Sequence, residues 1–129
     1  MPNVVAGGLD DLRTHLSQLI DAPVDANPIL VVTVYNVNDR MLQFSVSEGV
    51  VRLAHPLISP EQRGREGAVR AALEGADCTP EIHLGSDVSR FLDCDLPRSV
   101  DRVVQATYAV LESALGVDDS TDLVFASTR

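Results

Sequence analysis

The chain has 129 residues, of which 45% are hydrophobic and 22% charged, as is typical of one globular domain. Its formal net charge of −9 argues against binding to a phosphate backbone, because nucleic-acid binders carry a basic surface. All ten basic residues are arginine, so a lysine Schiff base, a P-loop lysine and a lysine general base are excluded.

The sequence also indicates the cellular compartment of the protein. No basic segment with a long apolar run after it opens the chain, and no apolar run approaches the roughly 18 residues that a membrane span needs. The two cysteines, Cys78 and Cys94, are too few for a disulfide-stapled secreted domain. We therefore expect a cytoplasmic protein that does not contact membranes.

The N-terminal part predicts one amphipathic helix. Apolar residues recur there at helical spacing, and Pro23 and Pro28 end the helix. The stripe consists of Leu9, Leu12, Leu16, Leu19 and Ile20. We expect the segments "MPNVVAGG" and "DDSTDLVFASTR" to be loose, which leaves a core of about residues 9–116 within a single domain that spans 1–129.

Residues 29–55 predict a meander of three strands, with turns at Asn38-Asp39 and Glu48-Gly49. This register places Thr33 opposite Phe44, and Phe44 opposite Leu53, so one face of the meander is consistently apolar. The other face is polar on the second strand but apolar on the first, where it carries Leu30, Val32 and Val34. A contiguous apolar patch of this kind indicates an interface.

A middle helix follows the meander. "SPEQ" is a helix start, with Ser59 as N-cap and Gln62 closing a capping box. Gly64 and Gly67 weaken this helix, which ends at Gly75.

The last part of the chain predicts a hairpin over 81–97, with its turn at 85–87, and a helix over 99–115. The element order is therefore α-βββ-α-ββ-α. It predicts an α+β fold, with a five-stranded, largely antiparallel sheet and three helices.

Signals for a chemical site are weak. The chain contains no nucleophile elbow, zinc-protease, dinucleotide-binding or P-loop motif. Cys94 stands between two aspartates, which oppose thiolate formation, and Cys78 with His83 lacks the second ligand pair of a structural zinc site. We therefore expect no catalytic residue, no metal and no cofactor. One alternative stays open, a small-ligand or enzyme site assembled in space around His55, His83 or the cluster of Arg63, Arg65 and Arg70.

The element order, the acidic charge and the closing segment "FLDCDLPRSVDRVVQATYAVLESAL" resemble the class I type III secretion chaperones and their wider chaperone-like superfamily. The resemblance covers about residues 9–116. It implies a homodimer formed by the middle helix and the neighbouring strand, with an extended client segment on the outside. The implied dimer contacts are Ala68, Val69, Ala72 and Leu73, and the implied client contacts are Leu30, Val32 and Val34. Phe91, an apolar residue on a strand face shared with charged residues, joins the client contacts.

The sequence thus favours a non-enzymatic, dimeric, chaperone-like protein that holds an extended segment of a client or secreted protein. Its partners would be a second copy of itself and the client, with no nucleic acid and no membrane. A structural subunit of a larger assembly is a third reading, which the sequence does not separate from the first.

Overall fold

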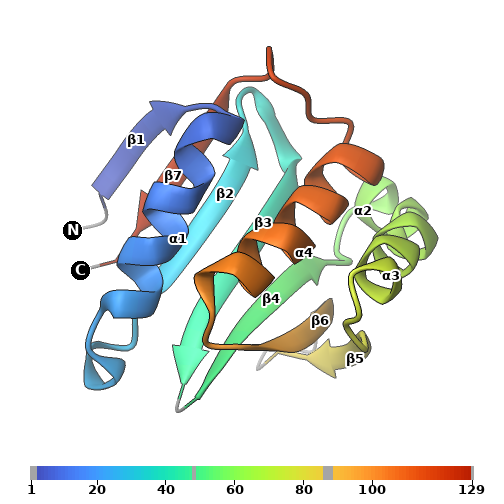
Figure 1. Cartoon of the computed structure of the whole chain (residues 1–129). Coiled ribbons are helices and arrows are strands. Elements are labelled where there is room, and N and C mark those ends of the chain that lie inside the picture. The colour runs from blue at the N-terminus through green and yellow to red at the C-terminus, as the bar shows by residue number, and fades with distance from the viewer. Residues whose placement is uncertain (1–2, 48, 86–88, 129) are drawn as a thin grey trace.

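The computed structural model describes residues 3–47, 49–85 and 89–128. Within these residues the chain forms an α+β fold with one seven-stranded sheet and four α-helices (Figure 1). The strands are β1 (Asn3–Gly7), β2 (Ile29–Val34), β3 (Val37–Ser47), β4 (Val50–Pro56), β5 (Glu81–Leu84), β6 (Arg90–Pro97) and β7 (Leu123–Ser127). The helices are α1 (Leu12–Asp21), α2 (Pro60–Gly64), α3 (Glu66–Gly75) and α4 (Val100–Ser113), with 3-10 turns η1 (Leu9–Asp11) and η2 (Val24–Ala26).

The strands follow the order β1-β7-β2-β3-β4-β6-β5, and each neighbouring pair is antiparallel. All four helices lie on the same side of the sheet, where α1 and α4 run side by side and α3 packs against α4 (Figure 1). We call this side the covered face. The opposite side, on which no helix of the described chain lies, is the open face.

The core fills the space between the helices and the covered face. The predicted leucine stripe is confirmed, because all five of its members are buried. Val103, Val110 and Leu111 supply the matching face of α4, and Leu42 and Phe44 belong to the covered face of β3. Alternation of buried and half-buried residues along β2 and β3 is the pattern of a sheet with one covered face.

The expectation of five strands and three helices is wrong, and the chain ends are the main reason. Residues 3–7 and 123–127 are strands rather than loose segments, and β7 lies between β1 and β2. Leu123 and Phe125 of β7 are 0% and 1% exposed, so the C-terminal segment is part of the core.

The extra helix comes from a break in the predicted middle helix. Ser59 caps α2 as expected, since its hydroxyl accepts from the Gln62 N–H at 3.1 Å while Gln62 Oε1 accepts from the Ser59 N–H at 3.0 Å. The helix stops after Gly64, and α3 begins beyond Arg65. Glycine in a helix interior costs about 1 kcal/mol relative to alanine, which favours a break at this point.

The first hairpin has a different register from the predicted one. Its turn lies at Tyr35-Asn36, where Asn36 takes a φ of +62°, and the pairing shifts by a bulge between Thr33 and Val34. Thr33 therefore faces Met41 instead of Phe44, a displacement of three residues. Since side chains alternate between the faces of a strand, a displacement by an odd number of residues exchanges the two faces of β2 relative to β3.

The predicted pairing of Phe44 with Leu53 between β3 and β4 is confirmed. The predicted hairpin over residues 81–97 also forms, as β5 and β6, and Ile82 lies opposite Leu92 in it. Residues 48 and 86–88, which include parts of two predicted turns, lie outside the described residues. Among the described helices, none is long and apolar enough to span a membrane.

Candidate binding surfaces

The residues predicted to contact a client on β2 lie in the core. Leu30, Val32 and Val34 are 1%, 0% and 8% exposed, so they are not available to a partner in this fold. That prediction is wrong because the true register turns these three side chains toward the helices. Their neighbours Val31 and Thr33 face the open side instead and are half-buried.

The open face is apolar over β1, β7 and β2. One row across the strands runs from Val4 through Ala126 to Val31, and the next row runs from Ala6 through Val124 to Thr33. We call these two rows, together with Ile29 at the start of β2 and Met41 of β3, the apolar half. It comprises Val4, Ala6, Ile29, Val31, Thr33, Met41, Val124 and Ala126. None of these side chains is charged, and Val4 is 65% exposed.

The open face becomes charged over β4, β6 and β5. Arg52 forms a two-pronged ion pair with Asp95, with Nε to Oδ1 at 2.9 Å and Nη2 to Oδ2 at 3.3 Å. Asp93 is 7% exposed, and burial raises the pKa of its carboxyl group, an effect that Arg52 at 4.0 Å opposes. Glu81 lies opposite Asp93 on the edge strand. We call this region the acidic half.

Phe91 lies at the border of the acidic half. It stands between Pro56 on β4 and His83 on β5, and it is half-buried. Of the predicted client contacts, it is the one whose side chain the structure leaves partly accessible on the open face.

The predicted dimer contacts on α3 are divided between the core and the surface. Val69 and Leu73 are fully buried, and α3 packs against α4. Ala68 is exposed and Ala72 is half-buried. The outward side of this region instead carries a stripe of small residues, which consists of Gly64, Gly67, Ala68, Ala71 and Gly75.

The edge strand β5 lies beyond the cover of α3. Ile82 and Leu84 are 45% and 56% exposed, although they belong to the same sheet face as the fully buried Leu92. Large apolar side chains at an uncovered sheet edge are typical of a contact surface.

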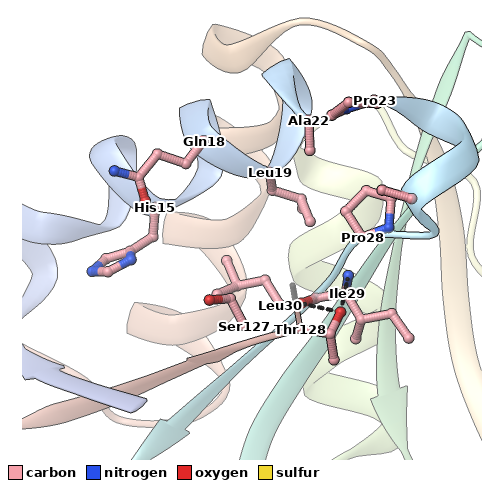
Figure 2. Close-up of a pocket in the computed structure, with 11 residues that line it drawn as sticks. His15, Gln18, Leu19, Ala22, Pro23, Pro28, Ile29, Leu30, Ser127 and Thr128 are labelled. Carbon is pink, nitrogen blue, oxygen red and sulfur yellow. Dashed lines mark hydrogen bonds between the residues drawn. The ribbon is translucent and has the colours of Figure 1, made fainter. Parts of the chain in front are cut away.

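A cavity of about 310 Å³ lies on the covered side, where the end of α1 meets η2 and the ends of β2 and β7 (Figure 2). Its walls include Leu19 of α1, Ala22 directly after α1, and Leu30 of β2, together with the hydroxyl-bearing Ser127 of β7. At one side, the His15 ring stacks on Phe125 with centroids 4.0 Å apart. Burial lowers the pKa of His15, which favours the uncharged ring, while the Asp11 carboxylate acts in the opposite direction.

His55 is fully buried on β4 and is not accessible to a substrate. Neither of its ring nitrogens has a hydrogen-bond partner among the described residues. Burial, reinforced by the Arg65 charge, lowers the pKa of His55 to about 4, while Asp39 acts in the opposite direction. A neutral, enclosed imidazole is a packing residue of the core.

The three arginines of the predicted cluster bind separate groups of this chain. Arg63 donates to the backbone carbonyl of Ile58. Arg65 pairs with the Asp39 carboxylate at 3.7 Å, and Arg70 pairs with Glu66 at 3.1 Å. These contacts do not combine the guanidinium groups into one anion site.

The remaining candidates for chemistry lie near β5 and β6. Cys78 and Cys94 are free and buried, and burial together with the adjacent Cys78 thiol raises the pKa of Cys94. His83 is exposed and lines an acidic cavity of about 340 Å³. Within the described part of the chain, no group of three or more His, Cys, Asp and Glu side chains has the geometry to hold a metal ion.

Comparisons of the chain with family models, with curated proteins and with solved structures find no match. Function is therefore argued from the surfaces described above.

The surface residues that sequence reasoning missed are mainly those of the terminal strands. Val4, Val124 and Ala126 lie in segments expected to be loose, although "VVA" and "LVFA" are runs of apolar residues. Runs of β-branched and aromatic residues are the signal that marks such segments as strands.

Proposed function

We propose that this protein is a non-enzymatic, chaperone-like binding module that holds an extended segment of a client protein against its open face. The apolar half carries the proposal, because it joins uncharged side chains of β1, β7, β2 and β3 into one area with no described helix over it. A contiguous apolar area on a sheet is typical of an interaction surface.

The edge strand β1 indicates how a client would bind. It carries no charged residue and no proline within Asn3–Gly7, and its outer side pairs with no described strand. Natural edge strands are usually protected by charge, proline or a bulge, because free backbone groups recruit another strand. An extended client segment beside β1 would continue the sheet, and its alternate side chains would extend the apolar half.

The charge of the protein favours a basic client. The net charge is −9, and the acidic half lies on the same face as the apolar half. A client with apolar residues at alternate positions and arginine or lysine beyond them would match both regions, and its approach would be accelerated by the opposite charge.

The proposal includes a homodimer at the other edge of the sheet. Ile82 and Leu84 of β5 are exposed there, next to the small-residue stripe of α2 and α3. A Cβ added at Gly64, Gly67 or Gly75 meets nothing within 4 Å, so packing inside one copy does not require glycine at these positions. Close approach of a second copy, related by two-fold symmetry, would require glycine at these positions.

A titration with an unfolded basic protein tests client binding. Reduced, carboxamidomethylated lysozyme with a fluorescent label is titrated with the protein, and binding is followed by fluorescence anisotropy. We expect Val31→Ser combined with Val124→Ser to weaken binding by about tenfold or more, since both changes remove apolar contact area. The matched control is Ile58→Ser, which alters a residue that is 53% exposed but lies outside the sheet.

Three results would contradict the proposal. They are unchanged binding by the Val31/Val124 double variant, an equal loss in the Ile58 control, and no binding by the parent protein. Light scattering tests the dimer separately. We expect a dimer for the parent chain and a monomer for Ala71→Arg, and a monomeric parent would refute the homodimer.

A further inference from the structure

The cavity beneath α1 lies on the covered side of the sheet, and Ile29 at the start of β2 is the one lining residue that it shares with the apolar half. Two parts of the sequence build it: residues 15–30, which run from α1 through η2 to the start of β2, and residues 127–128 at the end of β7. In Figure 2, Leu19 of α1 and Ala22 just after it extend toward Leu30 and Ser127 on the strands.

The cavity exists because short side chains stand where the core would otherwise close. Ala22, Ala26 and Ser127 line it, and none of them is long enough to reach across to the opposite wall. The cavity has a volume of about 310 Å³ and opens to solvent, since the lining residues Gln18, Pro23, Ala26 and Thr128 are exposed. It lies within the range of about 300–1,000 Å³ that is typical of small-molecule sites.

The walls are held in place without a ligand. Arg98 donates from Nε to the Ile20 carbonyl at 3.1 Å and from Nη2 to the Ala22 carbonyl at 3.3 Å, which fixes the end of α1. At the other wall, the N–H of Thr128 donates to the Ile29 carbonyl at 3.0 Å. Pro23 and Pro28 lock the φ angles of the connecting segment. A site fixed in advance binds at a lower entropic cost.

The lining specifies an uncharged ligand. Although 22% of the chain is charged, none of the eleven residues that line the cavity is Asp, Glu, Lys or Arg. Burial lowers the pKa of the one titratable ring, His15, and so disfavours its charged form. An ionic group in the cavity would find no counter-charge among these lining residues and would lose part of its hydration, which is unfavourable.

Two polar groups remain to orient a ligand. Ser127 shares the covered face with Leu30, its partner in the β2–β7 pairing, and its hydroxyl has no hydrogen bond to a described residue. The Gln18 side-chain amide is likewise unpaired within the described chain. The Thr128 hydroxyl is already engaged, because it accepts from the Ile29 N–H at 3.0 Å.

We propose that this cavity binds an uncharged, mainly apolar molecule with one hydroxyl or carbonyl group that hydrogen-bonds to Ser127. Its size follows from the volume: a cavity of about 150 Å³ accommodates benzene, so about twice that volume accommodates roughly a dozen non-hydrogen atoms. A fused two-ring aromatic alcohol has this size and polarity.

A series of three naphthalene derivatives tests the proposal at pH 7, by calorimetry and by amide chemical shifts of the whole protein. We expect 2-naphthol to bind saturably with one molecule per chain, and to shift the amide signals of residues 15–30 and 127–128. 2-Naphthoate, which carries a charge, is expected to bind at least about tenfold more weakly. Naphthalene is expected to bind without dependence on Ser127.

Variants locate the site. Ala22→Phe fills the cavity and is expected to abolish binding, whereas Ser113→Phe, which places the same ring at an exposed position of α4, retains it. Ala26→Leu is the second filling variant, to be used if circular dichroism shows that Ala22→Phe does not fold. Ser127→Val is expected to weaken 2-naphthol about fivefold, the value of one neutral hydrogen bond, and to leave naphthalene unchanged.

The proposal is overturned if folded filling variants bind 2-naphthol as tightly as the parent, or if 2-naphthoate binds as well as 2-naphthol. Shifts confined to Val31, Val124 and their open-face neighbours would also overturn it, since they would place the probe on the apolar half. These outcomes leave client binding untouched, because the cavity lining includes neither Val31 nor Val124, the two residues that the client-binding test changes.

Discussion

Substitution of Val31 and Val32 by threonine, one at a time, tests which face of β2 is buried. The two residues are adjacent, and the change from valine to threonine preserves both side-chain shape and β-propensity. Only the environment of the new hydroxyl differs. At position 32 the neighbours across the strands are Leu42 and Phe125, both buried and apolar. At position 31 they are Gln43 and Ala126 on the half-exposed open face.

The expected magnitudes follow from burial. Val32 is 0% exposed, so its threonine hydroxyl would lose water without gaining a partner, which costs about 1–3 kcal/mol of unfolding free energy. The hydroxyl at position 31 keeps contact with water, and its effect is expected within about 0.5 kcal/mol. A loss of about 2 kcal/mol is a large share of the 5–15 kcal/mol that typically stabilises a domain.

Urea unfolding, followed by circular dichroism at 222 nm, measures the unfolding free energy of both variants. The comparison is valid if the dependence of this free energy on urea concentration matches the parent and only the midpoints differ. Val32→Thr is expected to be the less stable of the two variants by more than about 0.5 kcal/mol. Equal losses, or a greater loss at Val31, would refute the register of the first hairpin and with it the position of the apolar half.

Three further predictions concern the core and its titratable groups. Phe125→Ala is expected to lower the unfolding free energy by about 3–5 kcal/mol, because the ring is 1% exposed within β7. Urea unfolding measures this loss. A negligible loss would mean that the C-terminal segment is loose. The low folded pKa of His55, about 4 against 6.5 when unfolded, means that the unfolded chain binds the proton first. The unfolding free energy should therefore fall by up to about 3 kcal/mol as the pH drops from about 6.5 to 4. Urea midpoints measured across that range should depend less on pH in His55→Leu than in the parent. The same pH dependence in both proteins would contradict this. Cys78 and Cys94 are buried, and the pKa of Cys94 is raised. Their thiols should therefore react with Ellman's reagent at pH 8 more than about tenfold slower in the folded protein than in urea. Equal rates would show that the thiols are accessible.

Local sequence signals predicted the elements that depend on neighbouring residues. The leucine stripe of α1, the capping box at Ser59 and Gln62, and the pairing of Phe44 with Leu53 follow from spacing and turn chemistry alone. These features need no knowledge of distant segments, which is why they could be read from the chain.

Features that depend on distant segments could not be read in the same way. β7 becomes a strand because it inserts between β1 and β2, which brings residue 126 next to residues 4 and 31. The predicted and the observed faces of β2 are exchanged because the turn lies at Asn36, which takes a positive φ, and not at Asn38. A strand that is apolar on both sides fits either register locally, and the pairing with Phe125 favours the observed one.

Methyl NMR of the folded protein with the unfolded lysozyme chain tests the central claim most directly. The claim is that the apolar half of the open face is the part of the molecule that binds a client. It predicts that the methyl signals of Val31, Val124 and Ala126 shift or broaden with added client, while those of Val32 and Val110 in the core stay unchanged. Client-induced changes at other surface methyls, with Val31, Val124 and Ala126 unaffected, would contradict it.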